Sequence, residues 1–565
     1  MKLSDYLAGL IKELGCEDIF GYQGGMISHF VDSIGRDGKI RIHTLLNEQS
    51  CGFAACGYAQ AGNKVGWVFT SSGPGATNLL TAICHAYYDS VPVVFITGQV
   101  NTTEAKGKLN VRQKAFQETD IVSVVENVTK RAYYVCNPLD IKRVFEEAVS
   151  VASEGRKGPV LIDLPMDIQR ADICISDLRS YAKLDVSNKK NSDDIVNIVS
   201  YYLQRSNKPV LLLGNGVKTE GQQAKARELV NRLGIPAVSS MLACDVLQND
   251  CPYNYGFVGA YGHRWANFIL AKCDLIISIG SRLDVRQIGG KKENFAPNAK
   301  LIRFDIDADE LENRIKTDEI QIVCELSRVF EYMDLITTSR DYTDWLSKCE
   351  YIRHKLCDLD YTVQNNIISR ISASCSDVDI IAADVGQNQV WVAQSFKVRE
   401  GQTILFSGGH GSMGFSLPAA IGAYYAVRKP LICFCGDGGL QMTIQEFQYI
   451  KAFKIPITIF VFNNHSLGMI RHFQEMYFEG RYIQTTNNNG YSVPDFKAIA
   501  KAYGIRSMDI EEYWNSLGCS SDEPIVVNIE LEETTYIWPK LEFGKPNQDQ
   551  EPLIDRILYN ELMEL

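Results

Sequence analysis

The stretch from 430 to 473 constrains the fold of this chain more than any other. Two apolar runs, Leu431–Cys435 and Ile457–Phe462, each end in a polar turn, and a helical pattern lies between them. The first turn is Gly436-Asp437-Gly438, and the second is Asn463-Asn464. We interpret the stretch as strand, turn, helix and strand, which puts both turns at the carboxyl ends of neighbouring parallel strands, where open α/β sheets bind ligands.

Together the two turns offer the oxygen atoms that magnesium prefers. Asp437 supplies carboxylate oxygens, Asn464 supplies an amide oxygen, and a backbone carbonyl near Ser466 is a third candidate ligand. Mg²⁺ keeps few protein ligands and completes its octahedron with phosphate and water. The alternative is an ordinary Asp-Gly turn and an Asn-rich loop, both common between strands. Glycines that would let a phosphate approach the backbone here are Gly436, Gly438 and Gly439.

The sequence after the first turn predicts where the following helix begins. Thr443-Ile444-Gln445-Glu446 fits a capping box, in which the first and last residues satisfy backbone amides at a helix start. We therefore expect the amino end of that helix close to the turn, where it would favour an anion.

Similar alternation of apolar runs with helical patterns recurs along the chain and predicts the fold class. We expect α/β architecture with three doubly wound parallel sheets, each covered on both faces by helices. The expected domains span residues 1–170, 190–345 and 360–565. A length of 565 residues agrees with three domains, since one core of this size would be unusual.

Charge and composition exclude several classes of partner. The net charge of −11 argues against nucleic acid or an anionic membrane. No apolar run is long enough to span a membrane, and the amino terminus is typical of an amphipathic helix rather than a signal peptide. The 16 cysteines include no C-x-x-C pair, which predicts reduced thiols in a cytoplasmic protein, without disulfides or zinc.

Loops of the first segment carry further candidate residues, each after an apolar run. Gly25 closes a glycine-rich turn, and Glu48 begins a helix of small residues. Plain alternatives stay open for both: a strand-to-helix turn for the glycine, and for Glu48 a helix amino-terminal acid favoured by the dipole. The other loop residues singled out here are Ser72, Gly73, Asn78, Phe116 and Gln117.

The spacing of Gly436-Asp437-Gly438 and Asn463-Asn464, with Asn464 standing 27 positions after Asp437, resembles the diphosphate-binding motif of thiamine diphosphate enzymes. The neighbouring text, including SGPGATN at 72–78, resembles the acetohydroxyacid (acetolactate) synthase branch, and the resemblance covers essentially the whole chain. It implies pyrimidine-binding, central and diphosphate-binding domains, with thiamine diphosphate and Mg²⁺ as cofactors. It also implies a carboligase that decarboxylates pyruvate and transfers the hydroxyethyl unit to a second 2-oxo acid, giving 2-acetolactate.

The resemblance assigns roles within the cofactor site. Glu48 would hydrogen-bond the pyrimidine ring nitrogen and so activate the cofactor, while Gln387 and Asn388 would contact the terminal phosphate. Met413, which could otherwise be core filler, would be the apolar wedge that holds the two cofactor rings together. The remaining residues that we assign to the cofactor are Gly411, Leu467, Gly468 and Met469, with Ser72, Gly73 and Asn78 from the first segment.

Glycine turns and a strand-end acid in the middle segment suit a dinucleotide, although such turns are weak signals alone. By resemblance they would hold a structural FAD. The residues concerned are Gly214, Gly216, Gly280, Arg282, Arg286 and Asp305. Arg286 would also lie near the substrate; the alternative for it is a surface ion pair.

By resemblance, Gln117 and the backbone near Gly25 orient substrate, with Phe116, Arg471 and Phe473 beside it. Two departures from the family leave the acceptor open. The segment 101–114 is longer than usual and rich in cations, and the stretch 471–473 differs from the usual text, with Phe473 where many members have Trp. One alternative is transfer to an anionic acceptor such as a keto-sugar nucleotide, and another is a non-catalytic scaffold.

The resemblance also implies an assembly. Glu48 and Asp437 must reach one cofactor, and in the family they come from different subunits, so we expect a homodimer or homotetramer with two-fold symmetry. A separate regulatory subunit is a further expected partner.

Overall fold

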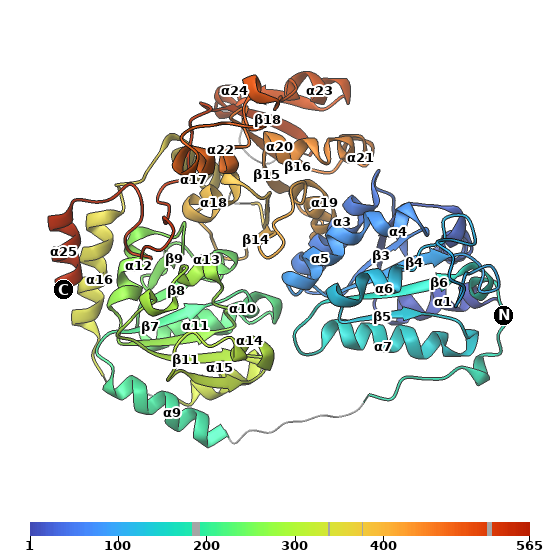
Figure 1. Ribbon diagram of the computed structural model, residues 1–565, viewed down its shortest axis with the longest axis horizontal. Coiled ribbons are helices and arrows are strands. Elements are labelled where there is room, and N and C mark those ends of the chain that lie inside the picture. The colour runs from blue at the N-terminus through green and yellow to red at the C-terminus, as the bar shows by residue number, and fades with distance from the viewer. Residues whose placement is uncertain (184–191, 337–339, 376, 517–521) are drawn as a thin grey trace.

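The computed structural model describes residues 1–183, 192–336, 340–375, 377–516 and 522–565 (Figure 1). It contains three sheets of six strands each, and the strand pairs within them are parallel. The predicted fold class, three doubly wound parallel sheets, is therefore confirmed. No helix in the described part of the chain is long and apolar enough to cross a membrane.

The first sheet has the strand order β2-β1-β3-β4-β6-β5. Its strands are β1 (Asp18–Gly21), β2 (Arg41–His43), β3 (Gly66–Thr70), β4 (Val93–Gln99), β5 (Arg131–Tyr134) and β6 (Pro159–Pro165). The α-helices of this part are α1 (Leu3–Glu13), α2 (Ser28–Asp37), α3 (Glu48–Gly62), α4 (Pro74–Asn78), α5 (Leu80–Tyr88), α6 (Ile121–Val125), α7 (Ile141–Ser153) and α8 (Met166–Gln169).

The second sheet has the order β12-β11-β10-β7-β8-β9. Its strands are β7 (Pro209–Leu213), β8 (Ala237–Ser239), β9 (Asn254–Phe257), β10 (Leu275–Ile279), β11 (Lys300–Asp305) and β12 (Ile320–Val323). The helices around it are α9 (Ser192–Arg205), α10 (Gly216–Thr219), α11 (Gln223–Leu233), α12 (Arg264–Lys272), α13 (Val285–Ile288), α14 (Ala308–Glu312), α15 (Leu326–Asp334) and α16 (Thr343–Leu356).

The third sheet has the order β14-β13-β15-β16-β18-β17. Its strands are β13 (Ile380–Ala383), β14 (Thr403–Phe406), β15 (Leu431–Gly436), β16 (Ile457–Asn463), β17 (Arg506–Asp509) and β18 (Ile525–Glu530). The helices of this part are α17 (Val363–Ser374), α18 (Gln387–Ser395), α19 (Ser416–Val427), α20 (Asp437–Gln441), α21 (Phe447–Ala452), α22 (Gly468–Tyr477), α23 (Phe496–Ala502), α24 (Ile510–Asn515) and α25 (Arg556–Glu564).

Each sheet has a switch point, where the chain turns from one side of a strand to the other. These points lie between β1 and β3, between β7 and β10, and between β13 and β15. The central strands have continuous apolar sequences. All seven residues of β16 are buried, as expected for a parallel strand covered on both faces. Ligand sites in such sheets lie at the carboxyl ends beside the switch point.

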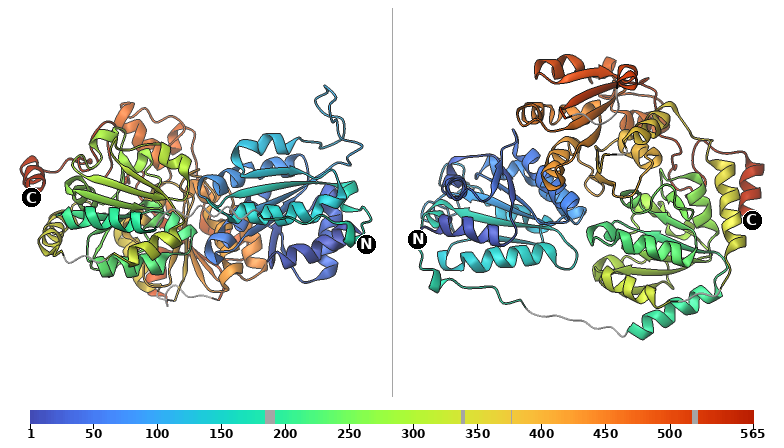
Figure 2. Two further views of the ribbon diagram at one scale, coloured as in Figure 1. Left: turned by 90° about the horizontal axis from the view of Figure 1, so that it is seen from below. Right: turned by 180° about the vertical axis from the view of Figure 1, so that it is seen from behind.

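The first and third parts join through α3 and α19, which lie side by side (Figure 1). Glycines permit this contact, because a Cβ atom at Gly57 would lie 2.0 Å from the Ala419 carbonyl oxygen, and one at Gly422 would lie 1.8 Å from that of Ala54. The two ends of the chain, marked N and C, lie on opposite sides of the molecule (Figures 1 and 2).

Two expectations from the sequence are wrong. The predicted capping box does not form: the helix after β15 begins at Asp437 itself, and Thr443 makes no capping bond. The Glu446 carboxylate instead accepts the Leu46 backbone N–H at 3.1 and 3.2 Å, across the contact between the first and third parts. The expected absence of disulfides fails at Cys375, which is disulfide-bonded, whereas fourteen other cysteines are free.

Glu446 makes the stability of this contact depend on pH. Its side chain is fully buried, and burial raises its pKa from 4.5 to about 7. Between those values the folded protein binds a proton that the unfolded chain has lost, so the contribution of Glu446 is most favourable below pH 4.5 and is lost as the pH rises through 7.

The variant Glu446→Gln should therefore unfold at a higher temperature than the wild type at pH 8, and the two should converge near pH 5. Gln keeps an acceptor for the Leu46 N–H without the buried charge, and the difference should reach up to about 3 kcal/mol. Calorimetric unfolding of both proteins across this range, with Glu13→Gln at an exposed position of α1 as the control, measures it. A constant difference at all pH values would contradict the assignment.

Candidate active site

The predicted pair of polar turns lies together at the carboxyl edge of the third sheet. β15 and β16 are adjacent, with Gly436 opposite Phe462. Asp437 is buried at the start of α20, where its Oδ1 accepts from the Gly438 N–H at 2.6 Å and from the Tyr491 hydroxyl at 2.9 Å. Its Oδ2 accepts from the Ser466 N–H at 3.3 Å.

Asn464 and Gln387 complete this edge. The Asn464 side-chain N–H donates to Gln387 Oε1 at 2.9 Å, which leaves the Asn464 amide oxygen as its ligand atom. Gln387 begins α18, just after β13, so three neighbouring strands contribute side chains. The described residues hold no group of three His, Cys, Asp or Glu side chains suited to a metal.

The Asp437 carboxyl group at this edge is buried. Burial raises the pKa of Asp437 above its ordinary value, although the Tyr491 hydroxyl and the Gly438 amide oppose this. A divalent cation next to a carboxylate reverses such a preference, because it stabilises the ionised form.

Glycines leave no room for side chains at this edge. A Cβ atom would lie 2.7 Å from Asp384 Oδ1 at Gly439, 1.9 Å from Gln387 Oε1 at Gly468, and 2.9 Å from the Met413 Cε atom at Gly438. Met413 and Leu467 therefore border Gly438, whose Cβ would lie 3.2 Å from Leu467 Cδ2. This cradle fits a phosphate that approaches the backbone closely.

Polar atoms without partners occur among the candidate residues of both the first and the third part. Buried side-chain oxygens that have no hydrogen-bond partner within the described residues include Ser72 Oγ, Asn388 Oδ1 and Ser412 Oγ. Such atoms are rare in native interiors unless a ligand, ion or water satisfies them. Gly411, beside Ser412, has a φ of 69° and borders Val385.

The candidates of the first part form a second group, at the switch point between β1 and β3. Glu48 opens α3, with Asn47 as the capping residue, and its Oε2 accepts from Asn78 Nδ2 at 2.9 Å. Gly73 and Gln117 both have a φ of 61°, and a Cβ atom at Gly73 would lie 3.0 Å from Gln117 Cβ. The structure thus brings Glu48 to Asn78, and Gly73 to Gln117.

Gly25 and Phe116 are not part of the contacts just described for Glu48 and Gln117. Gly25 starts a short 3₁₀ helix, Gly25–Ile27, and Phe116 is 79% exposed. Within the described part of one chain, no hydrogen bond or ion pair connects Glu48 or Gln117 to the Asp437 group. The two predicted halves of the site stand on different parts of the chain, the first and the third.

Helix α22 carries the predicted substrate residues in two different settings. Arg471 is buried, lies 4.4 Å from the Tyr482 ring centroid, donates to the Tyr536 hydroxyl, and has an Nε atom without a partner within the described residues. Phe473 packs with Tyr477 and Phe543 at ring distances of 4.8 and 6.2 Å. Met469, on the same helix, packs against the core of the third sheet.

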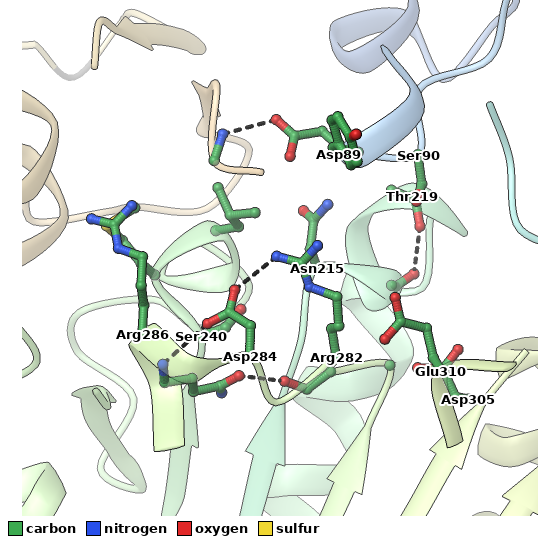
Figure 3. Close-up of a pocket in the computed structure, with 18 of the residues that line it drawn as sticks. Asp89, Ser90, Asn215, Thr219, Ser240, Arg282, Asp284, Arg286, Asp305 and Glu310 are labelled. Carbon is green, nitrogen blue, oxygen red and sulfur yellow. Dashed lines mark hydrogen bonds and ion pairs between the residues drawn. The ribbon is translucent and has the colours of Figure 1, made fainter. Parts of the chain in front are cut away.

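A cavity of about 170 Å³ lies mainly against the middle part, and Asp89 of the first part and Gly408 of the third part also line it (Figure 3). Of the predicted residues, Gly216, Gly280, Arg282, Arg286 and Asp305 line it. Gly214 instead supports Gly280, since its Cβ would lie 2.1 Å from the Gly280 carbonyl oxygen. Gly280 itself has a φ of 62°.

Charges and unpartnered polar groups face this cavity. Arg282 pairs with Asp284 at 2.7 Å, and Arg286 lies 5.8 Å from the Tyr261 ring centroid with no ion pair in the described residues. Burial raises the pKa of Asp305 at the end of β11. Ser240 Oγ and Gln287 Nε2 are buried there without partners among the described residues. A dinucleotide fits these features: glycines for close approach, guanidinium groups for phosphates and an acid at a strand end.

Sequence reasoning missed three residues that hold the site. Tyr491 lies 54 positions from Asp437, and no motif marks it. Asp384 directly follows β13 and accepts from Gly414 N, Ser416 N and Ser416 Oγ, each at 3.0 Å. Burial raises its pKa to about 6. Asp89 is the third, and its position at the end of an apolar helix was the available signal.

Comparison with known proteins agrees with this geometry. The N-terminal, central and C-terminal domain models of thiamine pyrophosphate enzymes match residues 1–124, 196–333 and 384–523. The chain is 35% identical to the acetolactate synthase large subunit of Lactococcus lactis, covering 94% of this chain and 93% of the relative. It is 32% identical to the acetolactate synthase isozyme 2 large subunit of Escherichia coli, covering 97% and 99%. The chain therefore belongs to the thiamine pyrophosphate enzymes, in the family of acetolactate synthase large subunits.

Proposed function

We propose that this protein is a thiamine diphosphate- and Mg²⁺-dependent carboligase that decarboxylates pyruvate and joins the two-carbon unit to a second 2-oxo acid, giving 2-acetolactate. The observation that carries the proposal is the position of Asp437 and Asn464 at the ends of adjoining strands, in a chain similar over nearly its whole length to acetolactate synthase large subunits. The reaction belongs to branched-chain amino acid biosynthesis.

The third domain would hold the diphosphate. Mg²⁺ would bind the Asp437 carboxylate, the Asn464 amide oxygen and the Ser466 backbone carbonyl. Gln387 and Asn388, together with the glycines Gly436, Gly438, Gly439 and Gly468, would surround the phosphates. When bound, thiamine diphosphate supplies a nucleophilic carbon and an electron sink for the electrons left when CO₂ departs.

Glu48 would control the proton at the far end of the cofactor. Its carboxyl group is oriented by Asn78 and lies partly buried at the start of α3, so it could exchange a proton with the pyrimidine nitrogen. Met413 would hold the cofactor rings in their reactive arrangement. Gln117 and the backbone at Gly25 would orient substrate, with Phe116, Arg286, Arg471 and Phe473 around it.

The assembly follows from the separation of the two groups. We assign residues 1–170 to pyrimidine binding, 190–345 to the central domain and 360–565 to diphosphate binding. Because Glu48 of one chain makes no bond to its own Asp437 group in the described residues, two copies related by a two-fold axis would complete each site. A homodimer or homotetramer in the cytoplasm, with a separate regulatory subunit, is the proposed form.

The middle cavity would take FAD in a structural role. Its support is the set of glycines Gly214, Gly216 and Gly280 at the β7–β10 switch point and the unpartnered Gln287 Nε2 atom. Arg282 and Arg286 would face the phosphates, and Asp305 would face a ribose.

The alternatives weighed from the sequence find no support. In the cation-rich segment, the Glu118 carboxylate accepts the backbone N–H groups of Lys106, Lys114 and Ala115, and Lys114 Nζ donates to the Thr103 carbonyl at 2.9 Å. Lys114 therefore stabilises its own loop. A scaffold without activity would not need Glu48, Asp437 and Asn464 in these positions.

Purified protein with pyruvate, thiamine diphosphate and Mg²⁺ should release CO₂ and form 2-acetolactate, identified by mass spectrometry. Glu48→Gln should keep the hydrogen bond to Asn78 but lose the proton-accepting charge, so its turnover should fall by roughly 10²–10⁴-fold. Glu13→Gln, at an exposed position of α1, is the control. CO₂ release without acetolactate would overturn the proposed product, and full activity of Glu48→Gln would overturn the role of Glu48.

The purified protein should also show the visible absorption of bound flavin. Gly216→Val should abolish that absorption, because a Cβ atom there would already lie 2.9 Å from Gly280 Cα. Gly290→Ala is the matched control, since a Cβ atom at Gly290 meets nothing within 4 Å. Unchanged circular dichroism would show that the variant is folded. A folded variant that keeps its flavin, or a wild type that never binds it, would contradict the proposal.

A further inference from the structure

The loop from 407 to 415, between β14 and α19, carries Met413 and is held at both ends by buried carboxylates. Asp384, from the same sheet, binds the amides of Gly414 and Ser416 near the start of α19. The other end is bound from a different part of the chain, by Asp89. Nothing in the sequence pattern connects these two segments.

Asp89 binds the loop with both carboxylate oxygens. The Gly408 N–H donates to Oδ2 at 2.8 Å, and the Gly409 N–H donates to Oδ1 at 2.6 Å. Asp89 follows α5 in the first part and is 3% exposed. The two bonds therefore fix two consecutive peptide groups of the third part against the first part.

His85 extends the contact by one residue. Its Nδ1 atom lies 3.1 Å from Ser407 Oγ and 3.1 Å from Asp89 Oδ2. Ser407 Oγ in turn accepts the Ser412 N–H at 3.1 Å, across the base of the loop. Met413 follows directly, so the bonds from Asp89 and His85 reach the residue before it.

Neighbouring side chains lie so close to the loop at Gly408 and Gly409 that no Cβ atom would fit there. A Cβ atom at Gly408 would lie 2.4 Å from Leu242 Cδ2, and one at Gly409 would lie 2.8 Å from Tyr88 Cβ. The His410 ring stacks on that of Tyr88 at 5.9 Å with an angle of 12°. The loop therefore packs closely against its surroundings on the Asp89 side, and the hydrogen bonds to Asp89 fix its position there.

A negative charge on Asp89 suits it to accept the two backbone N–H groups. Burial acts to raise its pKa, but the bonds from His85, Gly408 and Gly409 hold the pKa below its ordinary value. Asp89 is therefore ionised at neutral pH, when both of its oxygens are acceptors. An asparagine there would turn an N–H₂ group toward one of the two amides and lose that bond.

We infer that Asp89 is a positioning residue for Met413: through the amides of Gly408 and Gly409 the pyrimidine-binding domain sets the loop that faces the diphosphate cradle of its own chain. The role given to Met413 rests on the proposed function, whereas the hydrogen bonds do not. Asp89 also lines the cavity proposed for FAD, and it acts on Met413 through the loop.

Hydrogen exchange of the full-length protein without added cofactor tests the contact itself. In Asp89→Asn the amides of residues 408–412 should exchange roughly 10- to 100-fold faster than in the wild type, since a bond to a charged acceptor is lost. Exposed Asp32→Asn is the control and should leave this segment unchanged. Unchanged exchange in Asp89→Asn would overturn the inference, whatever the activity of the enzyme.

Ser407→Ala is a second variant if Asp89→Asn does not fold. It removes the acceptor of the Ser412 amide, so exchange at Ser412 should rise while Gly408 stays protected by Asp89. Equal protection of Ser412 in this variant and the wild type would also overturn the inference.

The loaded enzyme separates positioning from mere folding. In Asp89→Asn the near-ultraviolet circular dichroism of bound thiamine diphosphate should change, and kcat should fall roughly 10- to 100-fold with little change in the KM for pyruvate. Faster exchange with an unchanged cofactor spectrum and kcat would restrict Asp89 to stability. If the wild type turns over no pyruvate at all, the proposed function fails, while the exchange result still decides the contact.

Discussion

The pairing of β15 with β16 is the constraint on which the candidate site depends. Their register places Gly436 opposite Phe462, so Asp437 and Asn464 leave the sheet at nearly the same height. A slip of two residues would separate them by about 7 Å along the strands, too far for one metal ion. The buried apolar residues of both strands fix this register. A slip would move the polar residues that follow the strands into the buried sheet, where they would be costly.

The same arrangement occurs three times with different content. The switch point of the first sheet presents Glu48 and Asn78 nearby, that of the second presents a glycine-lined cavity, and that of the third presents the oxygen set around Asp437. The fold supplies three similar edges, and the residues at each edge determine its chemistry. The contacts between parts rest on buried acids, Asp89 and Glu446, each bonded to backbone amides because an unpaired buried carboxylate would be costly.

The local sequence pattern predicted those elements that form from local sequence alone. The three sheets, the turn at Asp437 and the loops around Glu48 follow from apolar runs and the glycines between them. Tyr491 and Asp89 could not be found in this way, because they reach the site from distant segments and only tertiary packing brings them there. The capping box at Thr443 failed for the same reason: Glu446 binds Leu46 across a contact that propensity does not describe.

The central claim is that a magnesium ion at Asp437 and Asn464 holds thiamine diphosphate. Calorimetric titration of the wild-type protein with thiamine diphosphate, with Mg²⁺ in excess and again after removal of the metal by a chelator, tests it most directly. The account predicts saturable binding with Mg²⁺ and a large loss of affinity without it. Absence of binding with Mg²⁺ in excess, or equal affinity with and without the metal, would contradict the account.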